Sequence, residues 1–524
     1  MKRIATIDFI RGFAIFGVCF VHFFSDLFDA DSALSNIDTL PLSLVLLLLI
    51  IVYLGTWGGL FVMISAAGNM FSMQANLEKG LSPKLVAEKQ IVSGLVLLAV
   101  SMLVEGVLQR YGYLGTLVPV WGPPQPTRWF WHMFTMTPVH CLSICMIING
   151  IVHGLLSQNE GFKEYKRNII VYLVLGILSV VVTQTIWNFT DSIIPGYPAA
   201  RYPPELGLVG DYYVDKPLMG LPWWVYIQYF GLLLLGGANT PLFPFLFTSF
   251  IGNAIGLALI AERENIIAKE KRTPHFCLKG ALLGFLVFIS GIIVGYLVGA
   301  GFNEYLPLSN SFGNITNISE GKNWLWYPWF AFQTGGQIVF IFLMLRAVEF
   351  RGKTKKFADK TTFIRRFGVP AFTIYAFHRY IGLIGVSVLA WISGNDYILD
   401  SKSLPFGYAL LNVAVWEKIG YVGSLEWIMG VMLTSAFPNI PKSKSALGEA
   451  RIENPKEKIP KKLLYGPMNV QKLFYEPEWE TEFEETDIKS VIAGELRICI
   501  WFGLFGILIL PLSIASFSVI RKID

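Results

Sequence analysis

The sequence is poor in charge and in cysteine. Only 15% of its 524 residues are charged, while 54% are hydrophobic, and an ordinary soluble domain carries about 25% charged residues. The five cysteines lie in apolar stretches without paired or zinc-ligand spacing, so we expect reduced packing residues and no disulfide or metal framework. A Gly-rich phosphate loop is also missing. These absences predict a polytopic membrane protein.

Long apolar runs dominate the chain. Because a helix needs about 20 apolar residues to cross a bilayer, we predict an all-α bundle of about eleven transmembrane helices. The expected spans lie near 4–27, 44–74, 88–112, 133–157, 169–190, 241–262, 277–300, 324–348, 367–392, 405–436 and 494–519. Two apolar runs, 41–74 and 222–262, are longer than one span and contain glycines, so we expect broken or interfacial helices there.

The basic residues predict the sidedness of the bundle. Lysine and arginine gather after every second predicted helix, at 79–89, 163–167, 263–272 and 351–366, and such loops face the cytoplasm. The first span follows Lys2-Arg3 directly and is too long for a signal-peptide core. We therefore predict a multi-pass cell-membrane protein with a cytoplasmic N-terminus. The net charge of +5 follows from this topology, so no nucleic-acid partner is expected.

The first span carries four ionisable residues: Asp8, Arg11, His22 and Asp26. Eleven helical steps of about 100° return His22 to the face of Arg11, about 16 Å farther along the axis. An unpaired charge in hydrocarbon costs at least about 2.5–3.5 kcal/mol, so this face should point into protein or water. We predict that it lines a functional site, although an Arg–Asp pair that locks helices and a packed histidine are the alternatives.

Several motifs resemble the transmembrane acyltransferase superfamily. They are Ile7-Asp8-x-x-Arg11-Gly12 with the following His22, the run from Leu60 to Gly68, Pro241-Leu-Phe-Pro244-Phe with Gly252, and the Tyr375-x-x-His378 pair. They are similar to bacterial and archaeal relatives of heparan-alpha-glucosaminide N-acetyltransferase and to acyltransferase-3 type proteins. The resemblance implies transfer of an acyl group, expected to be acetyl, from cytoplasmic acyl-CoA to a sugar or glycan on the far side of the membrane.

The resemblance covers roughly residues 1–393, which we take as the acyltransferase core. Residues 394–436 add one or more membrane segments. The polar stretch 437–490, rich in Pro, Lys and Glu, reads as a cytoplasmic insertion, and 491–524 as a C-terminal transmembrane helix. Residues 437–524 have no counterpart in the family, and Ser65-Ala66-Ala67 stands where the family usually has an extra glycine.

Acyl transfer from a thioester needs a base and stabilisation of an oxyanion. We expect His22 to be that base, with Asp26 one turn later orienting its ring. Arg11 is expected to pair with Asp8 or to hold the donor. His378 and Tyr375 are further candidates, either beside His22 or as a contact between helices. Other polar residues in the spans are Glu105, Gln109, His140, Asn149 and His153.

Substrate-binding residues are harder to separate from topology signals. Candidates for the CoA phosphates are Lys79, Lys84, Arg365, Arg366 and Arg379. Candidates for stacking on the acceptor are Trp129, Trp131 and His132. Basic loops and aromatic belts give the same patterns.

The expected partners are the lipid bilayer, acyl-CoA and the acceptor, and a homodimer is one option for the assembly. The competing functions are a proton-coupled transporter that uses the Asp8, Arg11, His22 and Asp26 face as a relay, and an inactive scaffold.

Overall fold

The computed structural model describes most of the central part of the chain. The described residues are 4–27, 57–109, 112–116, 136–193, 240–267, 275–300, 324–350, 354–378 and 424–436, with single residues and short turns at 42, 45, 50, 53–55, 133, 208–209, 212–213, 231–232 and 234–235. The predicted spans near 367–392 and 405–436 are described only in part. The predicted insertion 437–490 and the last predicted helix lie outside the described residues.

The described elements are helices, apart from one pair of two-residue antiparallel strands. They are α1 (Ala5–Leu27), α4 (Gly58–Glu78), α5 (Pro83–Leu103), the π-helical turn η2 (Val104–Leu108), α6 (Tyr113–Thr116), α8 (Pro138–Leu156), the 3-10 turn η4 (Gln158–Lys163), α9 (Tyr165–Ile193), β1 (Leu208–Val209), β2 (Tyr212–Tyr213), α11 (Leu242–Ile267), α12 (His275–Leu297), α15 (Trp326–Val348), α16 (Thr354–Lys360), α17 (Thr362–Phe367) and α21 (Leu425–Ala436). A further helical stretch covers 371–378 and is called the 371–378 helix below.

Several of the described helices have the length and apolar composition of membrane spans. Six candidate spans within the described residues are long and apolar enough to cross a bilayer: Pro83–Leu108, Pro138–Leu156, Tyr165–Thr190, Leu242–Glu262, Phe276–Leu297 and Trp326–Val348. The all-α class is therefore confirmed, and the six apolar helices support the membrane class. The number of about eleven spans, the cell-membrane location and the cytoplasmic N-terminus stay predictions.

Two helix starts coincide with the predicted interruptions of the long apolar runs. Trp57 precedes α4, which begins at Gly58 inside the glycine-rich stretch. The helix α11 begins at Leu242, directly after the second stretch, and contains a cis peptide bond between Phe243 and Pro244. Each of these helices therefore begins at or directly after its glycine-containing stretch.

Caps fix the starts of two other helices. The Ser82 hydroxyl accepts a hydrogen bond from the Leu85 N–H at 3.3 Å, and Pro83 occupies the first turn of α5. The N–H of Thr137 donates to Nδ1 of His140 at 3.3 Å, at the start of α8. The buried His140, noted in the sequence as a polar residue in a span, therefore serves as a helix cap.

The loop between α8 and α9 is short and polar. Asn159 and Glu160 adopt positive φ angles of 50° and 61°, and the Lys163 ammonium donates to the Glu160 carboxylate at 2.7 Å. This hydrogen bond lowers the pKa of the fully exposed Glu160 carboxyl. An exposed pair of this kind adds little to stability.

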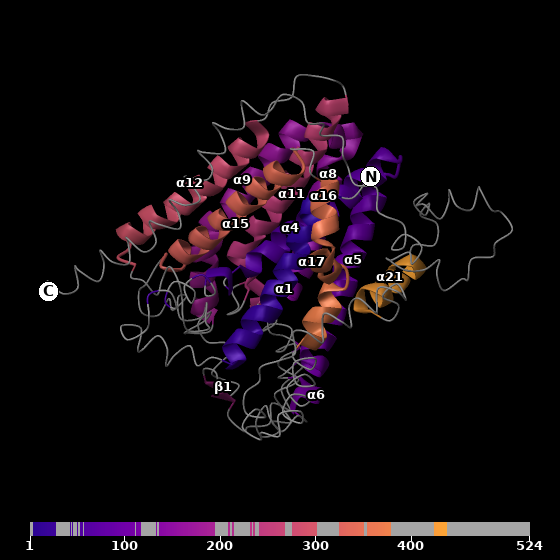
Figure 1. Cartoon of the computed structure of the whole chain (residues 1–524). Helices are drawn as coiled ribbons and strands as arrows, with labels where there is room; N and C mark the ends of the chain where they lie inside the picture. Colours follow the sequence, from indigo (N-terminus) through magenta and orange to yellow (C-terminus); the bar gives the residue numbers. More distant parts are fainter. Residues whose placement is uncertain are drawn as a thin grey trace.

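Small residues allow the helices to pack closely. A Cβ added at Gly94 of α5 would lie 2.7 Å from the Ser143 carbonyl oxygen of α8, and one at Gly284 of α12 would lie 2.9 Å from that of Gly335 on α15. Close packing at small residues drives helix association in lipid, where no hydrophobic force acts between helices. Figure 1 shows the result: α12 and α15 lie side by side, and α1 lies beside α17.

Candidate functional site

The first half of α1 holds a charge pair. Arg11 donates to Oδ1 of Asp8 across 3.2 Å, and the two residues are three positions apart on one helix face. The Asp8 side chain is 12% exposed and that of Arg11 34%. The predicted pairing of Arg11 with Asp8 is therefore observed. A guanidinium stays charged at this depth and has further donors for a second acceptor.

A buried carboxylate holds the start of α1 against the end of α15. Oε1 of Glu349 accepts hydrogen bonds from the N–H and the hydroxyl of Thr6, at 2.9 and 2.8 Å. Both residues are almost fully buried. Because the first N–H groups of a helix have no partner within it, Glu349 supplies a cap from another helix. The sequence analysis did not single out Glu349; its only signal is a carboxylate directly after an apolar span.

The helix α1 packs closely and in parallel along the segment 362–378. Gly12 contacts the backbone of Ile364 on α17, and a Cβ at Gly368 would lie 2.9 Å from the Gly12 nitrogen. Farther along, Ile15 and Cys19 share an apolar cluster with Phe367, Ala371 and Ile374. Residue numbers increase together on both sides, so the two segments run in the same direction.

This parallel packing places two histidines at similar positions along neighbouring segments. His22 lies three residues after Cys19 on α1, and His378 lies four residues after Ile374. At about 1.5 Å per residue, their backbones advance by about 4.5 and 6 Å from the shared cluster. The backbones of His22 and His378 therefore lie at similar distances beyond the cluster that α1 shares with the segment 362–378.

A polar network surrounds the 371–378 helix near its C-terminal end. The Tyr375 hydroxyl donates to Oε1 of Glu105 at 2.8 Å, and Nε2 of Gln109 donates to the Tyr375 carbonyl oxygen at 3.0 Å. Glu105 is 5% exposed and belongs to the π-helical turn η2. Such turns occur frequently at functional sites, because they change the direction of side chains within a helix.

The network also selects the tautomer of His378. Its Nδ1 lies 2.6 Å from the Tyr375 carbonyl oxygen, which can only accept. The neutral ring therefore carries its proton on Nδ1, and Nε2 is the basic nitrogen. His378 itself is 3% exposed.

Glu426 of α21 holds the other end of the 371–378 helix. Its carboxylate accepts from the N–H groups of Phe372 and Thr373, and from the Thr373 hydroxyl at 2.6 Å. A carboxylate at a helix N-terminus interacts favourably with the helix dipole. Sequence reasoning missed this contact as well, because it joins residues more than 50 positions apart.

Several predicted site residues lie outside the described part. The backbones of His22, Asp26 and Arg366 belong to described helices, but their side chains do not belong to the described residues. Arg379, Trp129, Trp131 and His132 lie outside the described residues altogether.

The described donor-site candidates have other contacts. Lys79 caps the C-terminus of α4, exposed Lys84 lies 3.8 Å from Glu88, and Arg365 donates to the Ala358 carbonyl oxygen. Each of the three residues makes a local contact of its own, and none of these contacts joins one candidate to another.

Two other polar residues from the sequence analysis lie at the end of the bundle away from Glu105 and Tyr375. Asn149 of α8 donates to the Ser249 hydroxyl of α11 at 2.8 Å, so it joins two helices. His153, one turn later, stacks on Tyr172 of α9 with 6.4 Å between ring centroids. Among the described residues, no group of three or more His, Cys, Asp or Glu is placed to hold a metal ion.

Comparisons with protein-family models and with curated proteins give no match to this chain.

Proposed function

We propose that the protein is a membrane-embedded acyltransferase, which moves an acyl group from cytoplasmic acyl-CoA to a sugar or glycan on the extracytoplasmic side. The observation that carries this proposal is the parallel packing of α1 with the 371–378 helix. In this packing Cys19, three residues before His22, shares an apolar cluster with Ile374, four residues before His378.

The network suits a base that acts on a hydroxyl or an amine. With its proton on Nδ1, His378 has a basic Nε2. A base at this depth takes the proton of the acceptor, whose oxygen or nitrogen attacks the thioester carbonyl carbon. The new ester or amide bond forms, the carbon–sulfur bond breaks, and the departing CoA thiolate takes the proton from the base. His22 and His378 both remain candidates for this role in the proposal.

Arg11 belongs to the donor side in this proposal. It lies about 16 Å from His22 along α1, toward the end that the basic loops assign to the cytoplasm. The acyl-CoA carbonyl or phosphate would approach its partly exposed guanidinium, while Asp8 keeps that group oriented.

Release of free CoA tests the proposal. Purified protein in nanodiscs is given acetyl-CoA and a pool of sugar acceptors, and free thiol is measured. We expect acceptor-dependent release, and a fall of kcat by about 10²–10⁴-fold in His22→Asn or His378→Gln. Binding of acetyl-CoA should persist in both variants. His153→Gln is the matched control, because His153 lies on α8 near the opposite end of the bundle. Absence of thiol release with every acceptor rejects the proposal.

A proton-coupled transporter is the second candidate. Ionisable residues gather in two places: Asp8, Arg11 and Glu349 at the start of α1, and Glu105 and His378 around Tyr375. Such groups within a membrane serve in proton relays. If no CoA is released while His22→Ala abolishes solute uptake into proteoliposomes, this candidate replaces the enzyme.

A further inference from the structure

The segment that joins α15 to α17 is strongly basic. Residues 351–366 contain seven lysines and arginines and one acidic residue, and this net charge of +6 exceeds the +5 of the whole chain. The other basic loops are balanced: 78–89, 160–167 and 262–272 each contain three or four basic residues and one acidic residue fewer, a net charge of +1. The positive-inside rule counts basic residues only, so topology does not require the excess. We propose that α16, within this segment, binds the headgroup of an anionic phospholipid.

One side of α16 packs on the first turns of α1. The ring of Phe357 meets that of Phe9 edge to face, with 5.0 Å between the centroids. Ala358 and Ala5 pack together, and both are 0% exposed. Arg365 of α17 donates a hydrogen bond to the Ala358 carbonyl oxygen. These contacts fix α16 beside the start of α1.

The other side of α16 carries two exposed lysines, Lys356 and Lys360. Residues four positions apart lie on one helix face, with about 5–6 Å between their Cβ atoms. Among the described residues, neither lysine forms a salt bridge. The carboxylates of Asp8 and Glu349, at the same end of the bundle, already accept hydrogen bonds from other groups. The two ammonium groups are therefore available to an anion from outside the protein.

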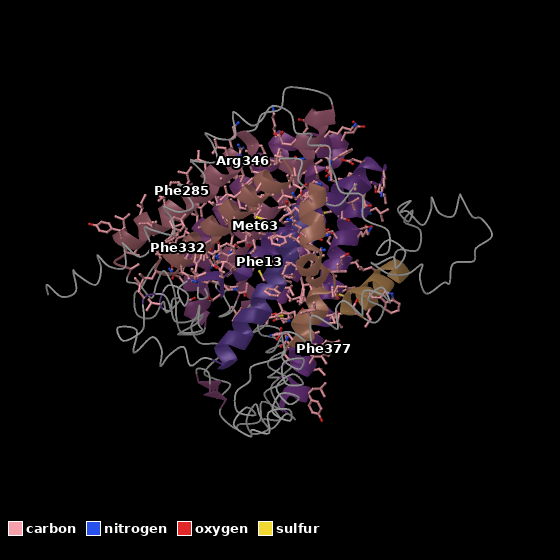
Figure 2. All side chains as sticks on the ribbon, in the orientation of Figure 1. Phe13, Met63, Phe285, Phe332, Arg346 and Phe377 are labelled. Atoms are coloured by element: carbon pink, nitrogen blue, oxygen red, sulfur yellow. The ribbon has the colours of Figure 1, made fainter. Side chains whose placement is uncertain are left out.

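The position of α16 favours a lipid as the source of that anion. The segment begins three residues after the candidate span Trp326–Val348, at the level where phospholipid phosphates lie. Figure 1 shows α16 toward one end of the bundle, and Figure 2 shows Arg346 of α15 toward the same end and Phe377 toward the opposite one. Clusters of four to eight basic residues directly beyond a span attract anionic lipids. A phospholipid of the adjoining leaflet matches both the charge and the level of the two lysines.

Lipid binding is measured without acyl-CoA, so the inference does not rest on the proposed function. Protein purified in an uncharged detergent is titrated with phosphatidylglycerol or with phosphatidylcholine, and bound lipid is counted by native mass spectrometry. We expect phosphatidylglycerol to bind at least about tenfold more tightly. The double variant Lys356→Gln/Lys360→Gln should lose at least about tenfold of that affinity, because each basic residue near an anionic surface contributes about fivefold. Its affinity for phosphatidylcholine should not change.

The double variant Lys163→Gln/Lys166→Gln is the matched control. It removes the same charge from a loop predicted on the same side of the membrane, where Lys163 already pairs with Glu160. Its affinity for phosphatidylglycerol should fall less than about threefold. Both double variants should keep the Tm of the lipid-free protein, because all four lysines are exposed.

Free coenzyme A separates a lipid headgroup from a soluble phosphate ligand. We expect an excess of coenzyme A to leave phosphatidylglycerol bound, and high salt to weaken the binding, since salt screens exposed charges. Three results would overturn the inference: equal binding of the two lipids, equal losses in the two double variants, or displacement of the lipid by coenzyme A. The last result would assign the two lysines to the acyl donor instead.

The failure of this inference and that of the proposed function are distinguishable. Binding of phosphatidylglycerol that depends on Lys356 and Lys360, without any CoA release, would reject the acyltransferase and keep the lipid site. CoA release by a protein whose phosphatidylglycerol binding is unchanged in Lys356→Gln/Lys360→Gln would reject the lipid site and keep the enzyme.

Discussion

At the scale of single residues, buried carboxylates tie together parts of the chain that are distant in sequence. Glu349 accepts two hydrogen bonds from Thr6, and Glu426 accepts hydrogen bonds from N–H groups in the first turn of the 371–378 helix. Both carboxylates satisfy donors that a helix cannot satisfy internally. They position the two segments that carry the candidate histidines.

Replacement of Glu349 by Ala should destabilise the protein by about 1–3 kcal/mol, because the buried N–H and hydroxyl of Thr6 lose their acceptor. Thermal unfolding in detergent measures this loss, and Glu349→Gln should recover part of it by keeping an oxygen acceptor. Glu88→Ala removes a carboxylate from an exposed pair with Lys84 and should change stability by less than about 0.5 kcal/mol. Equal losses in both variants would contradict this role for Glu349.

At the scale of elements, glycines set the distance between α1 and its neighbour. Gly12 lies against the Ile364 backbone, so a Cβ there would overlap with α17. Gly17, on the same helix, has no described atom within 4 Å of an added Cβ. The two glycines lie on the same helix, but only Gly12 packs against a neighbouring backbone.

Gly12→Ala should therefore lower stability by about 1–3 kcal/mol or more, because α1 and α17 must move apart. Gly17→Ala should raise it by about 0.5–1 kcal/mol through its higher helix propensity. Thermal unfolding measures both effects, and the acyl-transfer rate should fall only in Gly12→Ala. Tolerance of alanine at Gly12 would mean that α1 and α17 do not pack closely in the membrane.

At the scale of the whole molecule, the basic loops predict which end of the bundle faces the cytoplasm. Four of the native cysteines are buried and free, and Cys499, which lies outside the described residues, is replaced by Ser for this test. A membrane-impermeant maleimide should then label Glu164→Cys, between η4 and α9, only after permeabilisation. Ser311→Cys, in a loop predicted on the other side, should be labelled in intact cells. The reverse pattern would invert the donor and acceptor sides.

Much of the bundle follows from local patterns. Apolar runs predicted the long helices, although α4 begins only at Gly58, inside the span predicted at 44–74. Of the two roles expected for Arg11, pairing with Asp8 or holding the donor, the pairing is observed. The segment 351–366, expected only as a basic loop, contains α16 and α17; the packing of Ala358 and Phe367 beside α1 explains this.

The sequence by itself determined the membrane class, the helices and the polar residues of α1, because hydrophobicity and helical periodicity act over a few turns of chain. Only the tertiary structure decided that Glu349 accepts hydrogen bonds from Thr6, that Tyr375 donates to Glu105, and that Gln337 packs against Gly59. Those contacts depend on the register between helices, which close approach at small residues such as Gly12 sets, and no local pattern encodes which helices meet.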